Sequence, residues 1–291
     1  MIKNLALFSW NIDFMLPHGN SRMTSALSEL ETQLGKLPPT TAAVIFLQEC
    51  TPSDLEVIGE TGWVRSAFAR TDVGSEAWAS GMYGTTTLVD RRLAVGGVFR
   101  VHFGLTKMER DALFVDVLFH HPSSPGEEGN EKKGKQRRII RFCNTHLESL
   151  AQVPAYRPPQ AALAAKFMQD EGVHGALLAG DLNAIEPFDR TLHSVNNLHD
   201  AYLSLGGAED SEEGYTWGQQ AMPQLRQMYG CSRMDKVWYC GGVTVPKFER
   251  FGADVEVKDE KEKEEIKRWG GFEKAWVTDH LGVWAIVEVV D

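Results

Sequence analysis

Short apolar segments with the length of β-strands recur along the whole chain, and this regularity limits the folds that the chain can adopt. Several are apolar at every position, which is typical of strands covered on both faces of a sheet. The segments lie at 5–10, 43–48, 63–69, 84–90, 97–103, 112–120, 138–146, 175–180, 233–240 and 281–290. Hairpin-like strands in the middle and strand–helix alternation at both ends predict an α/β protein with two packed mixed sheets flanked by helices.

Three segments between these strands have helical patterns. In 21–36, apolar residues recur at i, i+4, i+7 and i+11, and Ser21 is expected to cap the start. Thr51 and Pro52 predict the N-cap and first position of a helix that continues to about residue 60. The Ala-rich segment 159–171 predicts the third helix.

The length and composition suit one domain. The chain has 291 residues, 43% of them hydrophobic, which is enough to bury a large core. We expect a single domain over 1–291 with a mobile polar loop at about 121–137 and a charged insertion at about 256–271, in which 258–271 forms an exposed helix. The basic cluster at 132–138 is a phosphate contact, a nuclear import sequence or, more simply, a solvated loop tip.

Net charge and cysteine usage exclude some function classes. The net charge of −10 argues against electrostatic coating of nucleic acid, although an enzyme with a local basic groove stays open. The sequence contains no apolar run of eighteen residues, so it predicts no membrane span, and the N-terminus lacks a signal-peptide pattern. Four scattered cysteines without metal spacing indicate reduced thiols. We expect a monomer in the nucleus and/or cytoplasm, neither secreted nor membrane-bound.

Polar side chains that can bind metals or phosphates stand at the edges of six apolar segments. One such residue at a strand edge is ordinary, but six groups built only from acids, amides, histidine and arginine are not explained by turns. They are Asn11 and Asp13; Glu49; His146 and Glu148; Asp181 and Asn183; Arg233 and Asp235; and Asp279 and His280. If the strand ends converge, these side chains form the kind of cluster that a hard divalent cation and a phosphate ester require.

The motifs that carry these residues resemble those of a known family. In order they are SWNID, LQE, NTHLES, AGDLNA, RMDKVWY and TDHLGVW. The set resembles the endonuclease/exonuclease/phosphatase family over residues 5–290, and WNID, HLES and YTW before RMD are most similar to the 5′-tyrosyl-DNA phosphodiesterases. The resemblance implies a four-layered α/β sandwich of the deoxyribonuclease I type. It also implies Mg²⁺, with Mn²⁺ as an alternative, and DNA ends carrying a 5′ protein or tyrosyl adduct as the partner in DNA repair.

Chemistry suggests a division of roles among the clustered side chains. Glu49 is the expected metal ligand, because a strand-end glutamate can hold Mg²⁺ while leaving coordination sites for substrate oxygens. Asp13 is expected on the metal side, with Asn11 within reach of a phosphate oxygen. Asp181 is the candidate base that orients or deprotonates the attacking water, and Asn183 would position phosphate or water beside it.

The two histidines are expected to act as donors to the phosphate. Adjacent residues in extended backbone face opposite ways, so Asp279 is a poor partner for His280. Asp235, from a neighbouring strand, is the better orienting carboxylate and would favour the imidazolium form of His280. Asp279 would instead face the metal, a division that the family shares, and His146 would be a second donor.

Four further residues are expected to contact the substrate, and each has a structural alternative. Arg157 resembles an arginine that follows HLES in the tyrosyl branch, but it also suits the start of a helix. Trp217 can stack a nucleobase, which contributes roughly 1–3 kcal/mol, or pack in the core, and Tyr83 has the same two interpretations. Arg233 contacts substrate or braces a strand or a carboxylate.

The predicted reaction is Mg²⁺-dependent hydrolysis of a phosphodiester by one in-line attack of water. The motifs contain no serine, cysteine or lysine that could serve as a covalent nucleophile. A tyrosyl diester has a phenolate leaving group with a pKa of about 10, so little general-acid assistance is required. Two positions depart from the tyrosyl branch: Phe14 replaces a glycine and Ile185 replaces an arginine.

Three alternatives stay open at this point. One is a nuclease or deadenylase acting on unmodified DNA or RNA. Another is a phosphodiesterase or phosphatase acting on small molecules or lipids, although RMDKVWY differs from the PAWCDR pattern of the inositol enzymes. The third is a non-catalytic binding module, against which the full set of Glu49, Asp181, Asn183, Asp235 and His280 argues.

Overall fold

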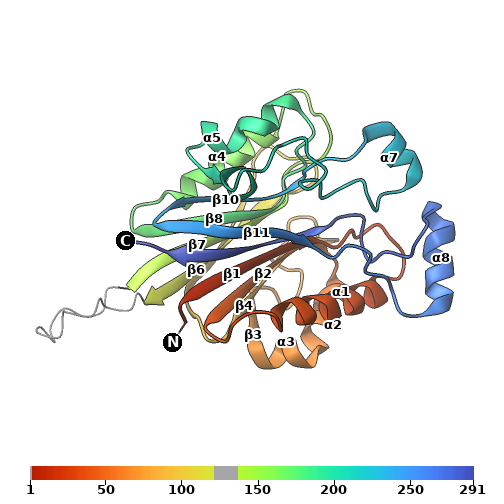
Figure 1. Cartoon of the computed structure of the whole chain (residues 1–291), viewed down its shortest axis with the longest axis horizontal. Coiled ribbons are helices and arrows are strands. Elements are labelled where there is room, and N and C mark those ends of the chain that lie inside the picture. Colours follow the sequence, from red (N-terminus) through yellow and green to blue (C-terminus); the bar gives the residue numbers. More distant parts are fainter. Residues whose placement is uncertain (1, 121–136) are drawn as a thin grey trace, which may run out of the picture.

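A computed structural model, which describes residues 2–120 and 137–291, contains two six-stranded sheets packed face to face (Figure 1). The first sheet has the order β11 (Val243–Phe251), β12 (Gly282–Val289), β1 (Asn4–Asn11), β2 (Thr41–Cys50), β4 (Gly84–Asp90) and β3 (Phe68–Arg70). The second has the order β5 (Ala94–His102), β6 (Asp111–His120), β7 (Arg137–Thr145), β8 (Val173–Asp181), β10 (Asp235–Gly241) and β9 (His199–Asp200). In each sheet one parallel pair, β1 with β2 and β7 with β8, lies among antiparallel neighbours.

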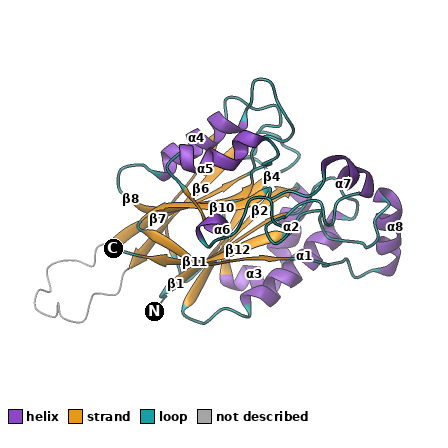
Figure 2. Ribbon diagram, turned by 45° about the horizontal axis from the view of Figure 1, so that its top comes forward, coloured by secondary structure: helices purple, strands orange, loops and turns teal. Residues whose placement is uncertain are grey.

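Helices cover the outer face of each sheet (Figure 2), which confirms the predicted four-layered α/β sandwich. On the first sheet, α1 (Gly19–Leu34) and α2 (Pro52–Glu60) bury apolar side chains against β1 and β2. On the second, α4 (Arg157–Met168) and α5 (Leu192–Val195) do the same. The remaining helices are α3 (Gly62–Ala67), η1 (Pro187–Thr191), α6 (Ala201–Ser204), α7 (Pro223–Tyr229) and α8 (Glu260–Gly270).

The central core lies between the two sheets. Leu7 and Phe46 of the first sheet belong to one buried cluster with Phe142 and Leu177 of the second. The rings of Phe46 and Phe142 meet edge to face, with centroids 6.3 Å apart. Because β1, β2 and β8 are covered on both faces, their sequences are apolar over most of their length, as the strand prediction assumed, whereas β7 begins with two arginines.

All four predicted helices are present, and one detail is wrong. The segments predicted at 21–36 and 159–171 correspond to α1 and α4. Thr51 caps α2 through a reciprocal pair of hydrogen bonds with Asp54, as expected for a threonine before proline. The charged segment at 258–271 contains the predicted helix, α8. Ser21 does not cap α1, because that helix begins at Gly19, and His18 at its N-cap makes no side-chain capping bond.

The strand predicted at 63–69 is wrong. Residues 62–67 form α3, and only Phe68–Arg70 are extended, as β3. Val64 lies in α3 and Phe68 directly follows it, and both side chains are buried against the first sheet. A short apolar run is ambiguous between strand and helix when only periodicity is considered.

The apolar runs also did not predict β11. This strand contains Pro246 and has exposed residues along much of its length, so it lacks an apolar run. It lies at the edge of the first sheet, and its register shifts between Thr244 and Lys247, where the proline is accommodated.

The remaining expectations concern cysteines, membrane spans and the polar loop. All four cysteines have free thiols. Among the described residues, no helix is long and apolar enough to cross a membrane. The loop predicted at 121–137 and most of the basic cluster at 132–138 lie outside the described residues, whereas Arg137 and Arg138 begin β7.

Candidate active site

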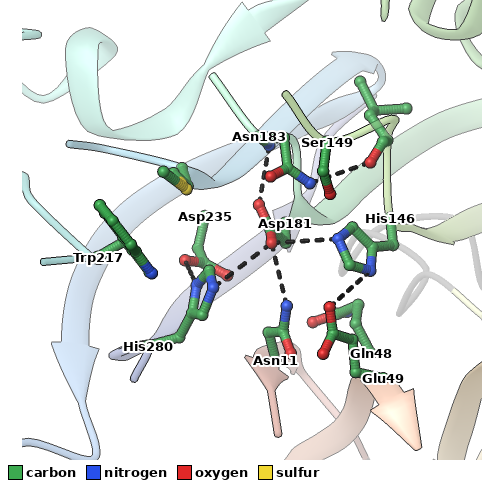
Figure 3. Close-up of polar contacts among 12 residues, drawn as sticks. Asn11, Gln48, Glu49, His146, Ser149, Asp181, Asn183, Trp217, Asp235 and His280 are labelled. Atoms are coloured by element: carbon green, nitrogen blue, oxygen red, sulfur yellow. Dashed lines mark hydrogen bonds and ion pairs between the residues drawn. The ribbon is translucent and has the colours of Figure 1, made fainter. Parts of the chain in front are cut away.

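Strand ends from both sheets converge on one cleft of about 760 Å³ (Figure 3). The parallel strands β1 and β2 deliver Asn11 and Glu49 to the same edge of the first sheet. In the second sheet β10 runs antiparallel to β8, and its first residue, Asp235, is in register with the last residue of β8, Asp181. The segment before β12 supplies His280, so the centre combines residues from both sheets.

Asp181 lies at the centre of this arrangement. Its Oδ2 accepts a hydrogen bond from Asn11 Nδ2 at 3.0 Å, and its Oδ1 accepts one from the Asn183 backbone N–H at 2.8 Å. Burial would raise the pKa of Asp181, but His280, His146 and the Asn183 amide lower it below its ordinary value. Asp181 is therefore an ionised carboxylate although it is buried.

His280 is held as an imidazolium by Asp235. Its Nδ1 lies 2.8 Å from Asp235 Oδ2, and its Nε2 lies 3.5 Å from Asp181 Oδ2. Burial lowers the pKa of His280, but Asp235, Asp181 and Asp279 outweigh burial and raise that pKa well above its ordinary value. Asp235 is the partner that side-chain alternation favoured, but it comes from the facing sheet and not from a neighbouring strand.

His146 has the opposite protonation state. Burial and the guanidinium of Arg110 lower the pKa of His146, so the ring is neutral. Arg110 Nη1 lies 2.6 Å from His146 Nδ1, and because a guanidinium only donates, Nδ1 accepts and the ring proton is on Nε2. That Nε2 is buried, lies 3.2 Å from Asp181 Oδ2, and has no hydrogen-bond partner among the described residues.

Three carboxylates gather beside this centre. Glu49 Oε2 accepts from the Phe14 backbone N–H at 3.0 Å, and Asp279 Oδ2 accepts from Trp217 Nε1 at 2.7 Å. Burial, Asp279 and Glu49 raise the pKa of Asp13 well above its ordinary value. These carboxylates repel one another, and the nearby guanidinium of Arg22 lowers the pKa of Asp13 without outweighing this repulsion and burial. Their hard oxygen donors suit Mg²⁺.

A second group of possible metal ligands overlaps the residues around Asp181. Ligand atoms of Asp181, Asp235 and His280 lie within 4.8 Å of one another, close enough to hold a metal ion. The Nδ1 of His280 is already hydrogen-bonded to Asp235, however, and an imidazolium repels a cation. This trio therefore fits a hydrogen-bonded donor better than a metal site.

The two asparagines hold the site together through their amides. Asn183 Nδ2 donates to the Leu147 backbone carbonyl at 3.0 Å, which leaves the Oδ1 of Asn183 as an acceptor for water. Asn11 does not lie free for a phosphate, because its Nδ2 binds Asp181 and its Oδ1 accepts from the Asp13 backbone N–H at 2.9 Å.

The backbone at the site is strained. Asp13, Glu49 and Asn183 have φ values of 53°, 58° and 47°, in the left-handed region that most side chains avoid. At the end of β8, a Cβ on Gly180 would lie 1.7 Å from the Thr145 carbonyl oxygen, so only glycine fits there. These conformations aim the strand-end side chains into one cleft.

Sequence reasoning missed two arginines that organise the site. Arg22 of α1 is buried and donates to the backbone carbonyls of Ile12, Asp13 and Val277, among others. It therefore joins the loop after β1 to the segment before β12. Arg110, which positions His146, precedes β6. Two sequence features could have indicated them. Arg22 is a cation on the buried face of a predicted helix, and Arg110 is a cation directly before an apolar strand.

Two predicted substrate contacts are wrong. Arg157 is 2% exposed, and its Nε and Nη2 bind both carboxylate oxygens of Asp189 at 2.9 and 2.7 Å. Arg233 is also 2% exposed and pairs with Asp200 and Glu209, so it braces carboxylates, as the alternative interpretation held. Both guanidiniums are already paired with carboxylates, and their side chains are almost fully buried.

Tyr83 and Trp217 both lie beside the centre. Tyr83 stacks on Phe14 with ring centroids 4.2 Å apart, and the Arg110 guanidinium lies 5.2 Å from the Tyr83 centroid. Tyr83 lines a small cavity together with Glu49 and His146. Trp217 lines the main cleft and holds Asp279 through its indole N–H.

Comparisons with known proteins agree with this fold. The profile of the Endonuclease/Exonuclease/phosphatase family matches residues 8–280. The structure is similar to two structures of D. rerio TDP2. The TM-score is 0.69 to a form humanised by 14 mutations and 0.67 to a complex with single strand DNA product. Each is 18% identical to this chain, and each alignment covers 98% of this chain and 99% of the TDP2 chain. The human Nocturnin catalytic domain with bound sulfate anion has a TM-score of 0.63 at 15% identity, covering 100% of this chain and 96% of its own. A search of curated proteins found no match. Because its profile spans most of the chain, this protein belongs to the endonuclease/exonuclease/phosphatase family.

Proposed function

We propose that this protein is a Mg²⁺-dependent phosphodiesterase that cleaves a 5′-phosphotyrosyl linkage to DNA by one in-line attack of water. The observation that carries the hydrolytic part is the placement of Asp181 between a cationic and a neutral histidine. The carboxylate is kept ionised in a buried site, while both imidazole Nε2 atoms face the same point. A base and two donors then surround the position that a phosphoryl group would take.

Mg²⁺ would be held by Glu49, Asp13 and Asp279. The fit rests on the mutual repulsion of these carboxylates, which contributes to the raised pKa of Asp13, and on their oxygen donor chemistry. When bound, the ion would neutralise charge on the phosphoryl oxygens and act as a Lewis acid.

The protein's own groups account for water and proton handling. Asp181 orients the attacking water and takes its proton, and the Oδ1 of Asn183 holds that water from a second side. His280 donates from Nε2 to charge that develops on the phosphoryl oxygens, and Asp235 keeps His280 protonated for that purpose. His146, neutral and protonated at Nε2, is the second donor.

The tyrosyl part of the proposal is supported by aromatic surfaces beside the centre. The stacked pair of Phe14 and Tyr83 adjoins Glu49 and His146, and Trp217 lies on the main cleft. A phenolate requires little proton donation as it leaves, which agrees with the lack of a further acid among the residues placed at the centre. D. rerio TDP2, a structural relative, binds a single strand DNA product.

The decisive experiment offers 5′-tyrosyl and 3′-tyrosyl single-stranded DNA with Mg²⁺ to the wild-type protein and to Asp181→Asn. We expect the wild type to release tyrosine from the 5′ substrate alone, and Asp181→Asn to be slower by a factor of at least about 100. Cleavage of unmodified oligonucleotides without tyrosine release would favour a nuclease. Hydrolysis of neither tyrosyl substrate would reject the specific proposal.

A further inference from the structure

We propose that Arg190 is the residue that contacts a second phosphate of a nucleic-acid strand, and that Asp210 competes with that phosphate. This inference rests on the proposed function and adds a specificity determinant outside the catalytic centre. It begins with the charge of the cleft. The acids that line the cleft outnumber the arginines, and the catalytic groups deal with only the scissile phosphate.

Among the described residues that line the cleft, two are arginines. The side chain of Arg233 is 1% exposed and pairs with Asp200 and Glu209, so it cannot reach a ligand. The side chain of Arg190 is 55% exposed. A nucleic-acid strand that extends along this cleft beyond the scissile phosphate could therefore contact one accessible guanidinium among the described lining residues, that of Arg190.

Arg190 is joined to a residue that is equally accessible. Its Nη1 and Nη2 lie 2.7 and 2.9 Å from the two carboxylate oxygens of Asp210, whose side chain is 64% exposed. Both residues line the cleft, η1 carrying the arginine and the segment before Tyr215 carrying the aspartate. An ion pair exposed to this degree contributes little net stability, so a phosphate can replace the carboxylate in the same two-point contact.

The backbone beneath Arg190 is firmly held although its side chain is exposed. Asp189, the preceding residue, accepts hydrogen bonds from the backbone N–H groups of Ile185 and Glu186 at 3.1 and 2.8 Å. The buried guanidinium of Arg157 binds the same carboxylate. Since the backbone at Arg190 is already fixed, placing its guanidinium on a phosphate orders only the side chain.

The test compares two substrates that share a scissile phosphodiester but differ in further phosphates. A 5′-tyrosyl oligonucleotide has them, and thymidine 5′-(4-nitrophenyl phosphate) does not. Arg190→Gln should raise KM for the oligonucleotide about tenfold with kcat retained, as expected for one lost charge-assisted contact, and should change KM for the nitrophenyl diester less than about twofold. Arg65→Gln, at an exposed position on α3, is the control for net charge.

Asp210→Asn supplies the complementary arm. It should lower KM for the oligonucleotide about threefold, and the gain should be smaller in the Arg190→Gln/Asp210→Asn double variant, because part of it acts through Arg190. The dependence of log(kcat/KM) on log salt should also become shallower in Arg190→Gln by about 0.7, the value for one phosphate on a single strand.

Equal effects of Arg190→Gln on both substrates, or no effect on either, would overturn the inference and leave the pair a structural contact. Failure of the wild type to release tyrosine would instead reject the proposed function. In that case the assignment of Arg190 is tested by the binding of an unmodified single-stranded oligonucleotide, measured by fluorescence anisotropy. Weaker binding by Arg190→Gln than by wild type supports the assignment, whereas equal affinity, or no binding by either, rejects it.

Discussion

His146 and His280 both direct an Nε2 atom at Asp181, yet their surroundings give them opposite charge states. The difference comes from the group on Nδ1: a guanidinium on His146 and a carboxylate on His280. A buried imidazole beside a cation stays neutral, whereas one beside carboxylates becomes charged. One residue type therefore supplies a neutral donor and a cationic donor within a few ångströms of the same oxygen.

Asp235→Asn should remove the charge from His280. Burial alone lowers the pKa of His280, and Asp235 is the largest of the groups that raise it. In metal-free protein we expect the pKa of His280, followed by NMR of the ring, to fall, because only Asp181 and Asp279 would then oppose the effect of burial. At neutral pH the kcat should fall about 100-fold, because the cationic donor is lost.

The pH dependence of the wild type follows from the same shift. Since the folded pKa of His280 is raised, its protonated form persists through neutrality and is lost only as pH rises through that raised value. The activity that depends on this donor should therefore decline on the alkaline side, and in Asp235→Asn the decline should move to lower pH. An unchanged His280 titration in the variant would contradict this assignment.

At the scale of elements, buried ion pairs hold the walls of the cleft. The pair of Arg157 and Asp189 joins the start of α4 to η1, and Arg157 Nη1 also donates to the backbone carbonyls of Glu148 and Leu150. A second cluster contains Arg233, Lys236, Asp200 and Glu209. Buried ion pairs therefore help to anchor the segments that carry the cleft walls.

Arg157→Met should lower the free energy of unfolding by about 3–5 kcal/mol, because it leaves Asp189 buried without its cation. Urea unfolding measures this loss. The double variant Arg157→Met/Asp189→Asn should recover part of it, since asparagine is neutral and still accepts from the Ile185 and Glu186 amides. If Arg157→Met raised KM without loss of stability, a direct substrate contact would be restored as the better interpretation.

Glu209→Gln should destabilise the protein in a pH-dependent manner. Burial raises the pKa of Glu209, but Lys236 and Arg233 outweigh burial and lower it below its ordinary value. Its contribution is therefore fully present above the unfolded pKa of about 4.3 and is lost as pH falls through the lower folded value. We expect a loss of about 2–4 kcal/mol at pH 7 that shrinks below about pH 4.

Urea unfolding at several pH values tests the role of Glu209. Glu171→Gln, at an exposed position outside the cleft, is the matched control and should change the free energy of unfolding by less than about 0.5 kcal/mol. A Glu209→Gln effect that is constant from pH 7 to pH 3 would show that the ion pairs with Lys236 and Arg233 do not stabilise the fold.

At the scale of the whole molecule, the convergence of strand ends could be predicted from sequence, because six of the apolar runs carry acids, amides, histidine or arginine at an edge. Alternation of side chains also indicated which aspartate faces His280. Which sheet supplies each side chain of the site could not be predicted. Asp181 and Asp235 are brought together by the strand register between β8 and β10, and no local sequence pattern specifies that register. Arg110 and Arg22 escaped notice because their hydrogen-bond partners are set by tertiary packing.

The protein should be less stable to unfolding without a bound metal ion than with one. Asp13, Glu49 and Asp279 repel one another, and a bound cation would relieve that repulsion. At a concentration of Mg²⁺ 100 times its Kd, binding adds about 2.7 kcal/mol to the free energy of unfolding. For a chain of this size that corresponds to a rise in Tm of several degrees, which a chelator should reverse.

Glu49→Gln separates metal binding from general ion effects. Without metal, this variant should be as stable as the wild type or more stable, because one of the repelling charges is gone, and its Tm should no longer respond to Mg²⁺. Glu56→Gln, which removes an exposed carboxylate from α2, should keep the full response. An Mg²⁺-dependent rise in Tm that survives in Glu49→Gln but disappears in Asp235→Asn would place the ion at Asp181, Asp235 and His280 instead.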